Sequence, residues 1–354
     1  MHVVVAEDRP NELVGVRLLV LSLQEHSPEV SFHAILPGAP DEVVRWLEDR
    51  GVSVSTERLL GAGWNVKPHA LLARLDAGED DVVWIDSDVI VTRDVSPIFA
   101  ELTPQHVAVT EDCRWGQAQG GTHRTLSWGL PVGRSMPVTA NTAVLRVTRE
   151  HVELLRAWVE LLSRPEYTEA QGRPPLERPI HHVGDQEVFT ALLGSEQFAS
   201  VPIRFIRRGS EIAQLFGPGG YTTAERLRSA RSGLPPFVHA MGQKPWRFHA
   251  SVSPREDKRA AYDSFAAELS PYRHVARRYR ADLPGDLSWL DRSTVVGGAL
   301  NRVLPSTLAG LPLAVVDEGV RWAKARMGRD RYAIELPVSS GTRGEASRHH
   351  RSLP

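Results

Sequence analysis

One stretch near residue 85 decides the fold, and it reads Val82-Val83-Trp84-Ile85-Asp86-Ser87-Asp88-Val89-Ile90-Val91. Its apolar first half predicts a buried strand, which runs directly into two carboxylates, Asp86 and Asp88. At the carboxyl end of a parallel strand, where open α/β sheets bind ligands, both acids can turn to one side and share a divalent cation. Oxygen ligands suit Mg²⁺ or Mn²⁺. The stretch therefore predicts a cation site at a sheet edge; an acidic turn after a strand is the simpler alternative.

Strands and helices are predicted to alternate around this stretch. β-branched runs predict strands at residues 3–6, 30–36, 52–55, 81–85, 106–110, 138–147 and 237–240. Helical patterns occupy residues 13–23, 41–50, 67–76, 149–162 and 185–193. The alternation indicates βαβ units, and so an α/β fold with a mainly parallel sheet and helices on both faces. Residues 111–136 lose this alternation, and their polar, glycine-rich stretch at 115–121 is too long for a simple connection and suggests a functional loop.

The composition excludes several other classes of protein. With 42% hydrophobic and 24% charged residues, the 354-residue chain has enough apolar material for a core. Its single cysteine, Cys113, excludes a disulfide or cysteine-based zinc scaffold. A formal net charge of −1 leaves no overall basic field of the kind that holds nucleic acid. We find no signal-peptide pattern and no apolar run of about 18 residues, so we expect a cytoplasmic protein without a transmembrane helix.

A second chemistry-bearing segment is Val238-His239-Ala240-Met241-Gly242-Gln243-Lys244-Pro245-Trp246. A histidine at a strand end can supply a third metal ligand through a neutral imidazole nitrogen. Gly242 lets the backbone come close to a phosphate, and Lys244 is a point charge suited to a diphosphate oxygen. A glycine–proline turn with a surface tryptophan is the simpler alternative.

Taken together with four further motifs, these segments resemble retaining glycosyltransferases of the GT-A fold, particularly the family 8 type that includes glycogenin and bacterial galactosyltransferases. The further motifs are Val3-Val4-Val5-Ala6-Glu7-Asp8, Lys67-Pro68-His69-Ala70-Leu71-Leu72-Ala73-Arg74-Leu75, and the pair Asn141-Thr142-Ala143-Val144-Leu145 and His181-His182-Val183-Gly184-Asp185-Gln186. The resemblance covers about residues 2–250. It implies a GT-A-like, Rossmann-like sheet and metal-dependent transfer of a sugar, with retention, from a nucleotide diphosphate sugar such as a UDP-sugar to an acceptor hydroxyl.

The resemblance also implies roles for individual residues. A Mn²⁺ or Mg²⁺ ion would be held by Asp86, Asp88 and His239. The donor would be bound by Ala6, Asp8, Lys67, Asp86, Ser87, Asn141, Gly242 and Lys244. Asp185 would act as nucleophile or as a stabiliser of the oxocarbenium-like centre, and Gln186 would orient donor or acceptor hydroxyls. The chain departs from the family at Lys67, where arginine is common, and at Ala143, where relatives have glycine.

Two other functions remain open. Phosphatases of the haloacid dehalogenase type also use an aspartate pair after a strand, and Asp86 would then be the nucleophile. Their pair follows the first strand, whereas this one follows the fourth, and Ile90 stands where they have threonine or valine. A non-catalytic protein that binds sugar nucleotides is the second alternative, which the departures at Lys67 and Ala143 leave open.

Several residues have weaker assignments. Trp64 and Asn65 would pack over the nucleotide or belong to the core, and His181 and His182 would contact the acceptor or form a solvated pair. Glu111, Asp112 and Trp115 open the long irregular stretch and would line the acceptor site or only cap it. No role is predicted for the lone thiol.

We expect a catalytic domain over residues 1–254, with a nucleotide-binding half at 1–110 and an acceptor-side half at 111–254. A helical region at 255–338 and a disordered tail at 339–354 follow. An arginine cluster at 273–280 precedes a weakly polar stretch at 295–316. This order predicts either peripheral contact with an anionic membrane, as for a lipid-linked acceptor, or a helical appendage on the catalytic domain. A glycan or a small molecule would be the acceptor if it is not lipid-linked.

Overall fold

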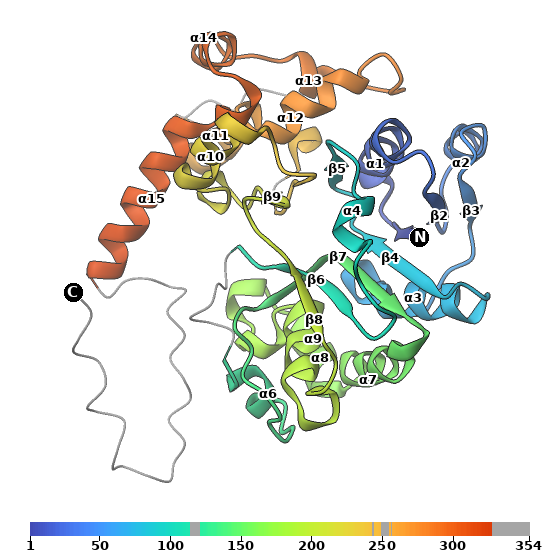
Figure 1. Cartoon of the computed structure of the whole chain (residues 1–354). Coiled ribbons are helices and arrows are strands. Elements are labelled where there is room, and N and C mark those ends of the chain that lie inside the picture. Colours follow the sequence, from blue (N-terminus) through green and yellow to red (C-terminus); the bar gives the residue numbers. More distant parts are fainter. Residues whose placement is uncertain (114–120, 243, 249–254, 256, 328–354) are drawn as a thin grey trace.

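The computed structural model describes residues 1–113, 121–242, 244–248, 255 and 257–327. Within them, a seven-stranded sheet forms the centre of the molecule (Figure 1). Its strands, in spatial order, are β3 (Ser53–Ser55), β2 (Ser31–Ile35), β1 (His2–Ala6), β4 (Asp81–Ile85), β7 (Ala140–Thr148), β6 (Val107–Glu111) and β8 (Ile203–Ile206). Strand β7 is antiparallel to β4 and β6, and the other neighbouring pairs are parallel. The mainly parallel α/β sheet predicted from the sequence is confirmed.

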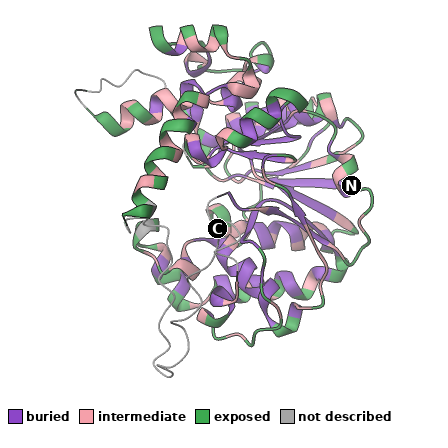
Figure 2. Ribbon diagram, turned by 60° about the vertical axis from the view of Figure 1, so that its left-hand side comes forward, coloured by how far each residue is buried: buried purple, intermediate pink, exposed green. Residues whose placement is uncertain are grey.

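Apolar side chains cover both faces of this sheet. Along β1, Val4 belongs to one apolar cluster, whereas Val3 and Val5 belong to another. Because successive side chains of a strand point to opposite faces, the two clusters are the two sides of the sheet. The first is covered by α3 (Lys67–Asp76), α7 (Val152–Leu162) and α9 (Asp185–Gly194), the second by α1 (Leu13–His26) and α2 (Asp41–Glu48). Figure 2 shows the strands buried between these layers. The predicted helices on both faces are confirmed.

A three-stranded sheet lies beside the large one, and the sequence did not predict it. Its order is β5 (Val89–Val91), β10 (Phe237–His239) and β9 (Ile212–Gln214). Strand β5 pairs antiparallel with β10, and His239 lies opposite Val89. Because Val89 directly follows the acid pair, this register places the end of β10 beside it.

Nine further α-helices complete the regular structure of the described residues. They are α4 (Ser96–Phe99), α6 (His123–Ser127), α8 (Pro165–Gln171), α10 (Thr223–Ser232), α11 (Lys258–Glu268), α12 (Pro271–Ala276), α13 (Ser288–Asp291), α14 (Val295–Val303) and α15 (Leu311–Arg326). None of the described helices has the length and apolar surface that crossing a bilayer requires.

The C-terminal helices share a core with the small sheet. Tyr272 of α12 and Trp289 of α13 belong to one apolar cluster with Trp246 and with Leu18 of α1. Helices α14 and α15 are much more exposed (Figure 2). The domain boundary after residue 254 stays a prediction, and the predicted tail at 339–354 lies outside the described residues.

Candidate active site

The acid pair lies on the turn that joins β4 to β5. The amide of Asp86 donates to the carbonyl of Ala143 at 2.8 Å, and its own carbonyl accepts from the amide of Val89 at 3.1 Å. The Asp86 carboxylate accepts from the indole Nε1 of Trp84 at 2.7 Å. The turn is therefore anchored to the central sheet on one side and to the small sheet on the other.

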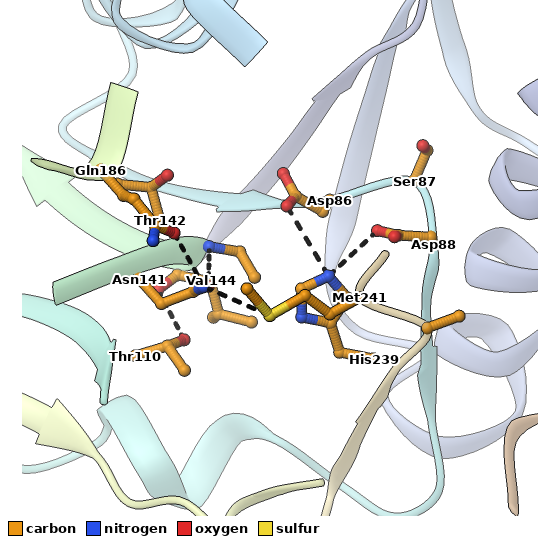
Figure 3. Close-up of polar contacts among 12 residues, drawn as sticks. Asp86, Ser87, Asp88, Thr110, Asn141, Thr142, Val144, Gln186, His239 and Met241 are labelled. Atoms are coloured by element: carbon orange, nitrogen blue, oxygen red, sulfur yellow. Dashed lines mark hydrogen bonds and ion pairs between the residues drawn. The ribbon is translucent and has the colours of Figure 1, made fainter. Parts of the chain in front are cut away.

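His239 completes a group of three ligand-type side chains (Figure 3). Its Nε2 lies 3.4 Å from Oδ1 of Asp88 and 4.0 Å from Oδ2 of Asp86. The pairing of β5 with β10 produces this proximity between residues that are far apart in sequence. The structure thus brings together the three residues that the sequence singled out as metal ligands.

The chemistry of this group fits a divalent cation. The candidate ligand atoms of Asp86, Asp88 and His239 all lie within 4.8 Å of one another. Two carboxylates with one imidazole suit Mn²⁺, and the carboxylates alone suit Mg²⁺. Nδ1 of His239 is buried without a hydrogen-bond partner among the described residues, so Nε2 is the nitrogen that faces the acids.

Lys244 places a positive charge beside the same group. Its Nζ forms an ion pair with Asp88 and donates to the carbonyl of Ala240 at 2.9 Å. Burial alone would raise the pKa of Asp88, but the charges of Lys244 and His239 outweigh it and hold the pKa of that carboxyl well below its ordinary value. Asp88 therefore stays ionised as a metal ligand must.

Gly242 has a conformational reason to be glycine. Its φ is +87°, in the left-handed region, and a Cβ there would lie 3.3 Å from the ring of Phe216. Gln243, the next residue, lies outside the described residues. The close approach of this backbone to a phosphate, which the sequence predicts, stays a prediction.

A buried clamp fixes the segment after Lys244, and nothing in the sequence pointed to it. The buried Glu12 accepts from Nε1 of Trp246 at 3.1 Å and forms an ion pair with Arg247. At Gly15, an added Cβ would lie 2.5 Å from the carbonyl oxygen of Ser87 and 3.1 Å from the Trp246 ring. The start of α1 therefore packs tightly against both the acid pair and the closing segment.

Lys67 lies within a buried network of charges. Its Nζ is 3.0 Å from Asp86 and 3.5 Å from Asp185, and it donates to Oγ1 of Thr142 at 2.9 Å. Burial alone would lower the pKa of Lys67, but the carboxylates of Asp185 and Asp86 raise it above its ordinary value. Lys67 therefore stays charged. It links the acid pair to Asp185, a contact that the sequence did not predict.

Asp185 begins α9 and is itself buried. Its Oδ2 accepts from the Thr142 hydroxyl at 2.6 Å and faces Lys67. Burial raises the pKa of Asp185 above its ordinary value, while Lys67 and the Thr142 hydrogen bond oppose the rise. One carboxylate oxygen is thus held by two partners.

Gln186 belongs to a polar cluster beside the Asp86–Asp88–His239 group (Figure 3). Nδ2 of Asn141 donates to Oε1 of Gln186 at 2.9 Å and to Oδ2 of Asp112 at 3.0 Å. Nε2 of Gln186 donates to Oε1 of Glu187 at 3.1 Å. The cluster fixes Gln186, Asn141 and Asp112 relative to one another.

Glu187 is a completely buried carboxyl group that sequence reasoning missed, although it directly follows Asp185 and Gln186. Its side chain is 0% exposed, and Oε2 has no hydrogen-bond partner among the described residues. Burial raises the pKa of Glu187 to about 7, and the charge of Arg124 opposes the rise.

We expect Glu187 to make the stability of the protein depend on pH. The pKa of Glu187 in the folded state exceeds the ordinary value of 4.5. Its contribution to the free energy of unfolding is therefore fully present below about pH 4.5 and is lost as the pH rises through about 7. Glu187→Gln should therefore gain free energy of unfolding relative to the natural protein between pH 5 and pH 8, by about 3 kcal/mol at most. Urea unfolding at several pH values measures this, and Glu169→Gln, at an exposed position of α8, is the control. Parallel pH profiles of Glu187→Gln and the natural protein would contradict it.

Two acids follow β1, and only the first of them has polar partners among the described residues. Glu7 is buried, accepts from the Ser87 hydroxyl at 2.7 Å and forms an ion pair with Arg9 at 2.7 Å. Asp8 is half-buried and has no polar partner among the described residues. Ala6 ends the strand, half-buried beside them. The Ser87 hydroxyl points away from the Asp86–Asp88–His239 group (Figure 3), toward the end of β1.

Of the weaker candidates, Trp64 is not a core residue, because 43% of it is exposed. The rings of His181 and His182 lie 4.1 Å apart and pack against Trp128, so they are not a solvated pair. Burial lowers the pKa of His181 to about 4. Both histidines thus belong largely to the packed layer beneath α9.

No protein-family model matches the chain, and no curated protein sequence does. Several solved structures are similar to it. The bifunctional glycosyltransferase WbbM, in its apo form, is 13% identical, with 70% of this chain and 46% of that chain covered and a TM-score of 0.49. The galactosyltransferase LgtC, in complex with donor and acceptor sugar analogs, is 15% identical, with 80% and 100% covered and a TM-score of 0.46. Mouse xyloside xylosyltransferase 1 is 14% identical, with 68% and 97% covered and a TM-score of 0.42. The chain thus spans less than half of WbbM and the full length of LgtC.

Proposed function

We propose that this protein is a metal-dependent glycosyltransferase that moves a sugar from a nucleotide diphosphate sugar to an acceptor hydroxyl. The observation that carries the proposal is the convergence of Asp86, Asp88 and His239 beside Lys244, at the carboxyl end of a central parallel strand. Open α/β sheets bind nucleotides at this edge. Two carboxylates, an imidazole and an ammonium group together suit a cation–diphosphate pair.

Breaking the bond between sugar and diphosphate leaves negative charge on the diphosphate. A divalent cation, when bound, would neutralise part of that charge. Lys244 would donate to a diphosphate oxygen and stabilise the same charge where it develops. Asp8 has no polar partner among the described residues and is available to the nucleoside. The buried Glu7, beside Asp8 in sequence, accepts from the Ser87 hydroxyl and fixes it.

As the bond breaks, positive charge develops on the sugar. A carboxylate on the side of the site away from the cation group would stabilise it. Asp185 supplies a buried carboxylate, and its Oδ2 is held by Thr142 and Lys67. We propose that it stabilises the oxocarbenium-like centre, with its second oxygen facing the sugar. Gln186, fixed by Asn141, would orient a hydroxyl of the donor or acceptor. Retention at the anomeric carbon and a uridine base are part of the proposal, as the resemblance implies.

Release of UDP from UDP-glucose or UDP-galactose tests this function. Even without an acceptor, we expect slow hydrolysis of at least one of these donors in Mn²⁺, and its loss in EDTA, because the leaving diphosphate needs charge stabilisation. Full activity in EDTA would contradict the metal-dependent reaction. Binding of the donor without UDP release would favour the non-catalytic alternative, and phosphate release from an aryl phosphate the phosphatase.

We also propose that the C-terminal helices contact a membrane surface, which would suit a lipid-linked acceptor. Exposed apolar side chains on α14 and α15 support this contact, among them Val295, Val303 and Trp322. The arginine cluster supports it less. Arg273 is buried and donates to the carbonyl of Leu290, and Arg280 forms an ion pair with Asp291. Sedimentation with anionic vesicles distinguishes this contact from a helical appendage in solution.

A further inference from the structure

The described part of the chain holds one exposed tryptophan next to the candidate active site. Trp64 lies on the short 3₁₀ turn Gly63–Val66, directly before the buried Lys67. A Cβ on Gly184, the residue before Asp185, would lie 4.0 Å from Cε2 of its ring. Trp64 is therefore joined to the cation site through Gly184, Asp185 and Lys67, all of which are buried.

The indole is held in place although 43% of the residue is exposed. The guanidinium of Arg178 lies over the ring, 5.6 Å from its centroid. Arg178 is fixed in turn, because it donates to the carbonyl of Val183 at 2.8 Å and to the carbonyl of Gln171 at 3.1 Å.

The turn that carries the indole is fixed as well. The Tyr167 hydroxyl donates to Oδ1 of Asn65 at 2.8 Å. Gly61, with φ +81°, lets the backbone pass so close that a Cβ would lie 2.7 Å from the carbonyl of Asn65. A large apolar ring that is exposed yet ordered costs hydrophobic free energy in the free protein, and a ligand that covers the ring would recover it.

A pyranose ring matches such a surface. One face of the ring carries C–H groups and packs on an aromatic face, while its hydroxyls remain free to bond neighbouring polar groups. A nucleotide base would also stack on an indole, but the polar groups available to a base are at the end of β1, where Asp8 has no partner among the described residues. Trp64 instead lies near Gly184, the residue before Asp185 and Gln186, where sugar chemistry is expected.

We propose that Trp64 is the stacking platform for a sugar ring of the acceptor. This proposal rests on the proposed function, in which the donor is the other substrate and its diphosphate binds near Asp86, Asp88 and Lys244. With the donor there, an acceptor ring on Trp64 would bring its hydroxyl toward Asp185 and Gln186. The acceptor would accordingly be a glycoside, either free or attached to a lipid.

Saturation-transfer NMR tests the platform with two named probes, methyl β-D-glucoside and methyl β-D-galactoside, in the presence of UDP and Mn²⁺. We expect the natural protein to transfer saturation to the ring protons of at least one glycoside. Trp64→Ala should weaken that binding about tenfold, and Trp64→Phe should restore part of it. The matched control is Trp322→Ala on α15, which removes another exposed tryptophan with an arginine, Arg326, over its ring at 4.0 Å.

Three outcomes would overturn the acceptor platform. They are absence of glycoside binding to the natural protein, unchanged binding in folded Trp64→Ala and Trp64→Phe, and an equal loss in Trp322→Ala. Two further measurements show whether another ligand occupies the indole of Trp64. Weaker UDP binding in Trp64→Ala would place the nucleotide base on the indole. A raised KM for UDP-glucose hydrolysis, with UDP binding unchanged, would place the donor sugar there. If no UDP-sugar is hydrolysed while glycoside binding depends on Trp64, the proposed function fails and the sugar site stands.

Discussion

Asp88→Asn is expected to lower UDP release from a nucleotide diphosphate sugar by about 10³-fold at saturating donor and Mn²⁺. The substitution keeps the shape of the side chain but removes the charge that faces both His239 and Lys244. An amide oxygen is a much weaker ligand for a divalent cation than a carboxylate. Mn²⁺ affinity should fall in parallel, and calorimetric titration with Mn²⁺ measures it separately from turnover.

Asp49→Asn is the matched control, because Asp49 is exposed at the end of α2 and has no part in the site. Circular dichroism and the melting temperature of both variants show whether the fold is kept. If folded Asp88→Asn retains more than about a tenth of the natural activity, the carboxylate does not have the role that transition-state charge stabilisation requires.

Lys67→Met is expected to reduce the free energy of unfolding by about 3–5 kcal/mol, because breaking a buried ion pair leaves uncompensated charge. The ammonium lies between Asp86 and Asp185, and methionine would keep its apolar stem without its charge. The loss should increase with pH, because the unpaired Asp185 is then forced to ionise without a partner. Urea unfolding at pH 5 and pH 7 measures both effects.

A double variant separates charge from packing. Lys67→Met with Asp185→Asn should recover part of the lost stability, since the second change removes the carboxylate that the first left unpaired. Lys258→Met, at an exposed position of α11, is the control for the loss of a lysine. A loss below about 1 kcal/mol in Lys67→Met would mean that water or a cation already compensates the two carboxylates.

The sequence predicted six of the seven strands of the central sheet, because each of them is a local pattern, and it missed β8 at the sheet edge. Val3, Val4 and Val5, for example, are all fully buried in β1, as a continuous β-branched run indicates. The small sheet was not predicted, because its strands have three residues each and only β10 was expected, at residues 237–240, whereas β5 and β9 were missed. Runs of that length do not show a period, and their register depends on partners elsewhere in the chain.

For the candidate site too, local patterns were predicted and contacts between distant residues were not. Asp86 and Asp88 were found because they directly follow a buried strand, and His239 because it ends a strand just before a glycine and a lysine; the structure places the three together. Charges that act within the fold had no such signal. The ion pair of Lys67 with Asp185 and the clamp of Glu12 on Trp246 join residues far apart in sequence, so only tertiary packing reveals them.

The arginine cluster shows how composition alone can mislead. Arg273, Arg278 and Arg280 look like a basic surface in the sequence, yet Arg273 is buried, Arg278 pairs with Glu25 and Arg280 pairs with Asp291. Two arginines of the cluster are therefore paired with acids and a third is buried, and the exposed valines of α14 and α15 remain as the feature that favours a surface contact.

Diffraction at the manganese absorption edge, from crystals grown with Mn²⁺ and UDP, tests the cation site most directly. We expect a single strong anomalous peak within bonding distance of the carboxylates of Asp86 and Asp88 and of Nε2 of His239, and no peak there in Asp88→Asn crystals. A manganese ion bound elsewhere, or none at millimolar Mn²⁺, would contradict the assignment of these three side chains and the sugar transfer inferred from them.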